Sequence, residues 1–154
     1  MNYHIDQSGK IEQTNKNTIL CLSNDSWEAV IIKARTKRQL QEIFRRNGQI
    51  RNYVLFSFCA GLAILLNRNK KIGKVFIDRE YPGKEGIIKE ILLKILIKEK
   101  VIPQIYFAQI GKRSLAHHRA HAVGLGKLKA KKVISFKEIF AEIKMTEVLR
   151  LKNA

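Results

Sequence analysis

The 154-residue sequence contains only two cysteines, two prolines and 13 acidic residues, against 30 lysines and arginines. Cys21 and Cys59 each lie in an apolar stretch, without the paired spacing of a zinc or redox site. A reducing, cytoplasmic setting is therefore expected. The N-terminal residues 1–10 include no apolar core of the kind that a secretory signal needs, so export is not expected.

Two nucleotide-binding signatures are also missing. No glycine loop followed by Lys-Ser or Lys-Thr occurs, which disfavours a nucleotide hydrolase of that class. Aromatic residues make up 8% of the chain, and Phe56, Phe58 and Phe76 lie in apolar runs rather than in a paired strand motif, so a base-stacking platform is not expected. Trp27 and Tyr53 could stack on bases, although we favour packing in the core or at its rim.

The longest apolar run, residues 53–66, is short for a membrane span. As a helix it would extend about 21 Å, against roughly 30 Å for a bilayer core. Arg51 and the basic stretch 67–71 flank it closely. We expect a buried core helix and no membrane partner. A peripheral protein, whose apolar helix and basic flanks contact anionic lipid, is the alternative.

What the chain has in excess is positive charge. The formal net charge is +17, while 45% of the residues are hydrophobic, as in an ordinary globular protein. The length suits one domain over residues 1–154. Because so many like charges repel one another, we expect an anionic partner, with nucleic acid as the first candidate.

The hydrophobic pattern predicts an α/β protein with a mixed sheet flanked by helices. Three strands form an opening antiparallel meander, a break at Asn47-Gly48 separates the two helices that follow, and strands then alternate with helices. Ser135 and Glu138 have the spacing of a capping box at the start of the last helix. The expected strands are 3–6, 18–22, 29–33, 74–78, 104–110 and 132–134. The first expected helix begins at about residue 36, and the others cover about 52–67, 83–100, 114–123 and 135–151.

Acidic residues stand at the ends of two of these strands. Asp6 ends the first strand and Asp78 ends the strand 74–78, so both can reach the crevice where open α/β sheets bind ligands. Paired carboxylates suit Mg²⁺ or Mn²⁺. Glu80 would point to the same side as Asp78 in an extended continuation, as a further ligand or a base that orients water. The plainer alternatives are turn-capping aspartates and a solvated Glu80 beside Arg79.

Three of the four histidines lie in residues 114–126. On a helix, His117 and His121 share one face, and His118 lies three residues before His121, so two imidazoles could serve one site. Histidine can relay a proton, bind a metal or contact phosphate. Small residues on this helix favour close packing against the sheet, which would hold the histidines near the strand ends. The alternative is a polar, partly exposed helix face.

The positive charge is concentrated in two stretches, and residues 101–136 contain no acid at all. Such surfaces are expected to contact the phosphates of DNA or RNA in a salt-dependent way. In the stretch around the histidines the cations are Lys112, Arg113, Arg119, Lys127, Lys129, Lys131 and Lys132; in the other they are Lys33, Arg35, Lys37, Arg38, Arg45, Arg46 and Arg51.

The order Asp-x-Ser-Gly after a first strand, a three-strand opening, an Asp ending a later strand and a polar C-terminal helix resembles the ribonuclease H-like superfamily. The likeness is greatest to its small members that open with Asp-Glu-Ser-Gly, and it covers residues 2–130. It implies a two-metal nuclease with Asp6 and Asp78 as core carboxylates and Mg or Mn ions about 4 Å apart. Gln7 departs from that pattern, and histidines replace the usual C-terminal Asp, as some Holliday-junction resolvases allow.

These observations predict that the protein is a metal-dependent nuclease acting on DNA, RNA or a hybrid. Asp6 and Asp78 would bind the metal, Glu80 would assist, and His117 or His121 would orient or protonate groups at the scissile phosphate. The backbone contacts expected are Lys112, Arg113, Arg119, Lys127, Lys129, Arg35 and Arg38. The alternative is a non-catalytic nucleic-acid-binding protein of degenerate fold within a larger nucleoprotein complex.

Overall fold

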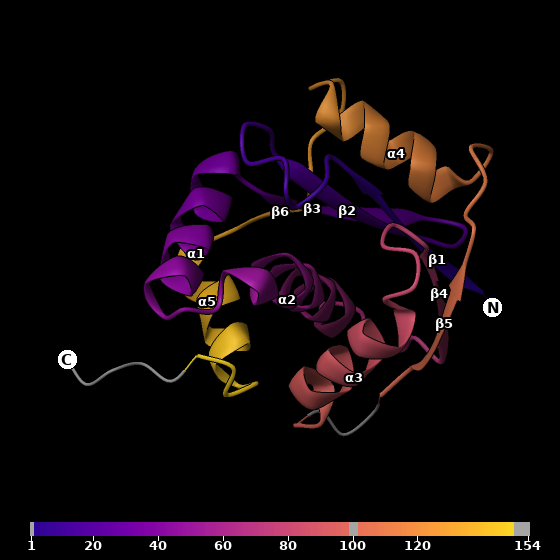
Figure 1. Cartoon of the computed structure of the whole chain (residues 1–154). Coiled ribbons are helices and arrows are strands. Elements are labelled where there is room, and N and C mark those ends of the chain that lie inside the picture. The colour runs from indigo at the N-terminus through magenta and orange to yellow at the C-terminus, as the bar shows by residue number, and fades with distance from the viewer. Residues whose placement is uncertain (1, 99–101, 150–154) are drawn as a thin grey trace.

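A computed structural model describes residues 2–98 and 102–149 and shows one six-stranded mixed sheet (Figure 1). The order across the sheet is β5-β4-β1-β2-β3-β6. The antiparallel meander and the added parallel strands are confirmed. The strands are β1 Tyr3–Ser8, β2 Thr18–Ser23, β3 Trp27–Ile32, β4 Lys74–Asp78, β5 Gln104–Ala108 and β6 Lys132–Ile134.

Only β2 runs against the other five strands, because it pairs antiparallel with β1 and β3 while the remaining pairs are parallel. The carboxyl ends of five strands therefore lie at one edge of the sheet. In α/β folds this edge is where ligands bind. The topology thus brings the end of β1 beside the end of β4, although more than 60 residues separate them in the sequence.

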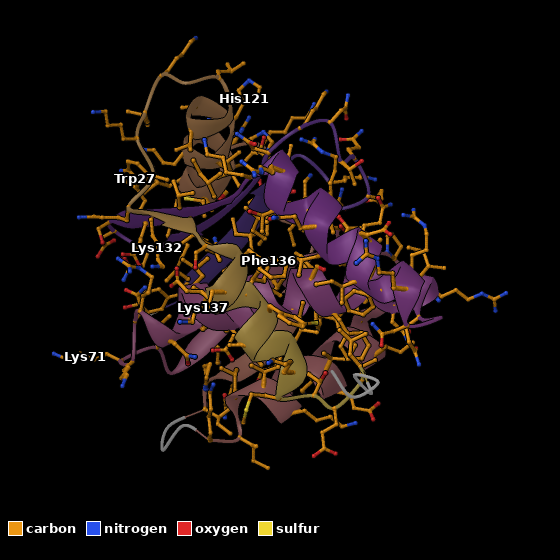
Figure 2. All side chains as sticks on the ribbon, turned by 90° about the vertical axis from the view of Figure 1, so that its left-hand side faces the viewer. Trp27, Lys71, His121, Lys132, Phe136 and Lys137 are labelled. Atoms are coloured by element: carbon orange, nitrogen blue, oxygen red, sulfur yellow. The ribbon has the colours of Figure 1, made fainter. Side chains whose placement is uncertain are left out.

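Helices cover the two faces of the sheet unequally (Figure 1). One face packs against α2, which α1, α3 and α5 surround, and the other packs only against α4 among the described helices. In Figure 2 the labelled Phe136 of α5 and His121 of α4 lie on opposite sides of the sheet. The helices are α1 Ala34–Arg46, a 3-10 turn Ile50–Asn52, α2 Tyr53–Asn67, α3 Glu85–Leu96, α4 Leu115–Gly124 and α5 Phe136–Lys144.

The apolar run predicted to be a core helix is indeed the central helix. Eleven of the 15 residues of α2 are buried, among them Leu62, Leu65 and the Cys59 thiol. Gly61 lies so close to Ile32 and Leu20 that a Cβ there would crowd both side chains. Among the described residues, Ile50–Asn67 is the one helical segment long and apolar enough to cross a membrane, and 61% of it is buried within the protein.

Some element boundaries differ from those expected. The strand β5 ends at Ala108, two residues early, and α3 ends at Leu96; the expected end near Lys100 lies outside the described residues. The predicted capping box of α5 is confirmed, but the helix ends at Lys144 rather than near residue 151, which also lies outside the described residues. The Thr146 hydroxyl donates to the Ile143 carbonyl at 2.6 Å, and Glu147 adopts a φ of 59°, which stops the helix.

The loop between β1 and β2 is fixed by polar groups from α1, from α2 and from the segment that follows β4. The Tyr53 hydroxyl donates to the Ile11 carbonyl at 3.0 Å, and the Ile11 amide donates to the Tyr81 hydroxyl at 3.3 Å. The ammonium of Lys37 donates to the carbonyls of Lys10 and Gln13 at 3.1 and 2.6 Å. Since this loop begins at the carboxyl end of β1, these bonds hold rigid the edge of the sheet where the acidic residues lie.

Gly9 opens that loop and is expected to be sensitive to substitution. Its φ is +78°, and a Cβ there would overlap the carbonyl oxygen of Asn17. Gly48 provides a matched control, because its φ is +67° but no atom lies within 4 Å of a Cβ there. We expect Gly9→Ala to lower the free energy of unfolding by about 1 to 3 kcal/mol more than Gly48→Ala does. Urea denaturation of both variants measures the difference, and equal losses would contradict a role for the Asn17 contact.

Candidate active site

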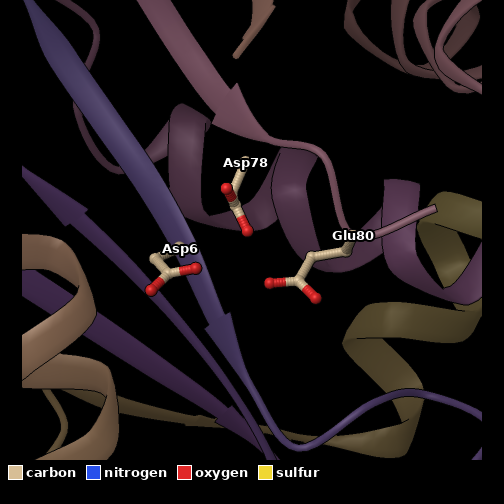
Figure 3. Close-up of side chains that lie close together, drawn as sticks. All are labelled: Asp6, Asp78 and Glu80. Carbon is tan, nitrogen blue, oxygen red and sulfur yellow. The ribbon is translucent and has the colours of Figure 1, made fainter. Parts of the chain in front are cut away.

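Two strands and one turn bring three carboxylates together. The parallel register pairs Ile5 with Ile77, so Asp6 and Asp78 follow side by side on the same face. Glu80 reaches them through a tight turn, in which its amide donates to the Asp78 carbonyl at 2.9 Å, and not through the extended continuation expected. Ligand oxygens of all three residues lie within 4.8 Å of one another, and their carboxylates converge in Figure 3.

Hydrogen bonds hold the two aspartates in place. One oxygen of Asp6 accepts from the Gln7 amide at 2.9 Å, and the other lies 2.7 Å from Nδ1 of His117. Asp78 accepts from the Ile110 amide at 2.7 Å. Each aspartate is therefore oriented by backbone or by α4 and keeps free lone pairs for a ligand.

Burial and mutual repulsion change the acidity of this cluster. Burial raises the pKa of Asp6, which is 3% exposed, against the opposing effects of the Gln7 amide and His117. Burial first, and then hydrogen bonding to Asp78 and the negative charge of its carboxylate, raise the pKa of Glu80 to about 8. Without a cation, this raised pKa favours the protonated form of Glu80 at neutral pH.

This raised pKa makes the ion-free protein less stable as the pH rises. The unfolded chain releases the Glu80 proton near pH 4.5 while the folded chain keeps it to about pH 8, so stability falls across that window. At pH 8 we expect Glu80→Gln to be more stable than the wild type by on the order of 2 kcal/mol, with no advantage at pH 4.5.

Urea denaturation in EDTA at several pH values tests this difference. The exposed Glu90 provides the control, because Glu90→Gln should follow the wild type at every pH. An advantage of Glu80→Gln that is independent of pH would contradict the raised pKa of Glu80.

The carboxylates open into a cleft of about 580 Å³. Gln7, which is 9% exposed, also borders this cleft, but its side chain points to the face of β1 opposite to Asp6, where its amide donates to the Tyr81 hydroxyl at 3.5 Å. The full lining is Asp6, Gln7, Asp78, Arg79, Glu80, Pro82, Gln109, Ile110, Gly111, Lys112 and His117.

The two histidines expected to share this site are separated. His117 contacts Asp6, but His121 lines another cleft, of about 430 Å³, together with Ser8 and Gly9. The prediction that both imidazoles address one site is therefore wrong. Four residues along a helix return to the same face but advance about 6 Å along its axis, enough to carry His121 past the carboxylates.

The basic residues of the C-terminal stretch also have different environments. Lys112 lines the acidic cleft, and Arg113 is exposed beside it at the start of α4. Arg119 instead lies over the Trp27 ring at 5.7 Å, and its Nε is buried without a partner. Lys127 and Lys129 are exposed in the segment after α4. Of this group, only Lys112 is placed directly at the carboxylates.

The second basic stretch is not at the cleft. Arg35 and Arg38 are exposed on α1, and Arg38 donates to the Thr14 carbonyl at 2.9 Å. Lys37, counted among the phosphate-binding cations from sequence, is 0% exposed and bound to the β1–β2 loop. Tyr53 is likewise buried, 2% exposed, so it is a core residue and not a base-stacking one. The alternation of polar and apolar residues along α1 did not distinguish Lys37 from its exposed neighbours.

Comparison with known proteins adds no assignment: no family model, no curated protein and no solved structure matches this chain.

Proposed function

We propose that the protein is a divalent-metal-dependent nuclease whose active site is the cluster of Asp6, Asp78 and Glu80. The observation that supports this most is that three carboxylates, from residues 6, 78 and 80, lie within 4.8 Å of one another in an open cleft. Three acids so close are stable together only with a proton or a cation between them.

The donor set fits Mg²⁺ or Mn²⁺. Asp6 and Asp78 would hold the ion, with Glu80 as the third carboxylate, because hard oxygen ligands are those that these cations prefer. When bound, the ion would polarise a phosphate oxygen and lower the pKa of a bound water. His117 orients Asp6 through the 2.7 Å contact, and Glu80 lies where it can accept a proton from an attacking water.

The charge of the chain supports a polyanionic substrate. The net charge is +17, yet three of the 13 acidic residues are gathered in this one cleft. Lys112 lines the cleft and Arg113 follows it at the surface. A basic surface around a small acidic centre attracts a phosphate backbone and leaves a cation-binding point at its middle.

Cleavage of labelled nucleic acids tests the proposal. Single-stranded, duplex, hybrid and branched substrates of DNA and RNA are incubated with the protein in Mg²⁺, in Mn²⁺ and in EDTA. We expect cleavage of at least one substrate class with metal, none in EDTA, and weaker binding as salt rises.

An absence of cleavage with either ion would overturn the nuclease. If binding in that case were salt-dependent and indifferent to metal, the protein would be the non-catalytic nucleic-acid binder that the sequence leaves as the alternative.

A further inference from the structure

Three aromatic rings form a row across the strands that lead into the acidic cleft. The register pairs His4 with Phe76 and Phe76 with Tyr106 on β1, β4 and β5. The Phe76 and Tyr106 rings are stacked, with centroids 5.3 Å apart and planes at 23°, while His4 meets Phe76 edge-on at 6.0 Å. The sequence did not reveal this row, because its residues belong to three separate segments that only strand pairing brings together.

The row lies on the open part of the sheet. The helix α4 packs over β1, β2 and β3, and Figure 1 shows β4 and β5 extending beyond it. Tyr106 is 43% exposed, whereas Val75 and Ile77, which alternate with Phe76, are buried on the opposite face against the core. His4 and Phe76 are half-buried, so the row is most open to a partner at Tyr106.

The rings and the carboxylates belong to the same surface. Along β1 and β4, His4 and Phe76 precede Asp6 and Asp78 by two residues, so all four side chains point to one face. Two residues of strand span about 6.7 Å, close to the length of one extended nucleotide. A base on the rings would thus leave an adjoining phosphate at the carboxylate cleft.

Positive charge lies at both ends of this surface. The ammonium of Lys74 is 5.5 Å from the centre of the Tyr106 ring, and Lys112 lines the far side of the cleft. Cations that flank exposed ring faces complement a chain of phosphates carrying flat bases. Since a base can lie on a ring only when its own face is free, the expected partner has unpaired bases.

We propose that His4, Phe76 and Tyr106 form a base-stacking platform that selects single-stranded nucleic acid and guides it to the cleft. The binding itself does not depend on catalysis. The inference rests on the proposed nuclease function only where it assigns a role to the adjoining cleft. If that cleft cleaves nucleic acid, single-stranded nucleic acid is its substrate class.

Binding of short oligonucleotides in EDTA tests the platform apart from cleavage. Fluorescence anisotropy with labelled 12-mers of deoxythymidine and of uridine, and with a blunt 12-base-pair duplex, gives the dissociation constants. We expect Tyr106→Ala to weaken binding of at least one single strand by about 10- to 100-fold and to leave duplex binding nearly unchanged. The two single strands distinguish DNA from RNA.

The chain offers a matched control on its other side. Phe136 and Phe140 of α5 are also stacked, at 5.3 Å and 28°, with the Lys144 ammonium 5.0 Å from the Phe140 ring. Phe140→Ala removes a ring of the same kind from the opposite face of the sheet and should not change oligonucleotide binding. Tyr106→Phe keeps the ring and should bind as the wild type does.

Photocrosslinking gives a second measurement that does not depend on affinity. A single strand carrying 5-iodouracil should crosslink to Phe76 or Tyr106, as located by mass spectrometry of the digested adduct. Equal losses for Tyr106→Ala and Phe140→Ala, or crosslinks confined to other residues, would overturn the platform. An absence of cleavage by the wild type, together with intact single-strand binding, would instead overturn the proposed nuclease function and leave the platform standing.

Discussion

Asp78→Asn and Asp6→Asn are each expected to reduce metal-dependent cleavage by about 10³-fold, which corresponds to roughly 4 kcal/mol of activation free energy. Each substitution removes one of three negative ligands within 4.8 Å of one another while preserving the size of the side chain. For Asp78 the amide oxygen can still accept from Ile110, so the loop after β5 should keep its position. Single-turnover cleavage with saturating Mn²⁺ measures the loss.

Asp25→Asn is the control for charge, since Asp25 is exposed in the turn between β2 and β3, outside the cluster. It changes the net charge by the same amount and should cleave at the wild-type rate. Asp78→Asn should also keep or raise the stability of the ion-free protein, because one of the repelling charges is gone. Activity and stability would then change in opposite directions. Cleavage that survives both substitutions unchanged would contradict the proposed site.

The second large effect is on stability. Lys37→Ala is expected to lower the free energy of unfolding by about 3 to 5 kcal/mol. The Lys37 side chain is 0% exposed, and its ammonium donates to the Gln13 carbonyl at 2.6 Å and to the Thr18 hydroxyl at 3.0 Å, as well as to Lys10. Removing it takes the charged donor from these buried acceptors, leaves the Lys10 and Gln13 carbonyls with only the amides of Gln13 and Lys16, and creates a cavity beside the loop that follows β1.

Two further variants separate the causes. Lys37→Met fills most of the volume without supplying a donor, so its loss should be smaller than that of Lys37→Ala but still above about 1 kcal/mol. Lys33→Ala removes an exposed cation just before α1 and should be nearly neutral. Urea denaturation at pH 7 orders the three variants. A loss for Lys37→Ala no greater than for Lys33→Ala would contradict the structural role of this ammonium.

Much of the fold could be predicted because its elements are encoded locally. The strand-type run of β4, the continuous apolar run of α2 and the Ser135 capping box each depend on neighbours within a few residues, and each is found where it was expected, whereas β1 continues to Ser8, two residues beyond its expected end. The ends of helices were less predictable. The early end of α5 depends on the Thr146 hydroxyl and on the left-handed conformation of Glu147, which hydrophobic periodicity does not report.

By itself, then, the sequence determined the mixed sheet, the placement of Asp78 at a strand end, and an excess of positive charge that favours an anionic partner; Asp6 instead lies two residues before the end of β1. Only the tertiary structure decided which side chains meet. Strand register joins Phe76 to Tyr106 across separate segments, and a tight turn adds Glu80 to the aspartates.

Packing decided the rest. The position of α4 on the sheet selects His117 rather than His121, and the packing of α1 buries Lys37. The physical reason is that these contacts join residues tens of positions apart. Their geometry follows from strand pairing and helix packing, which no local pattern of residues contains.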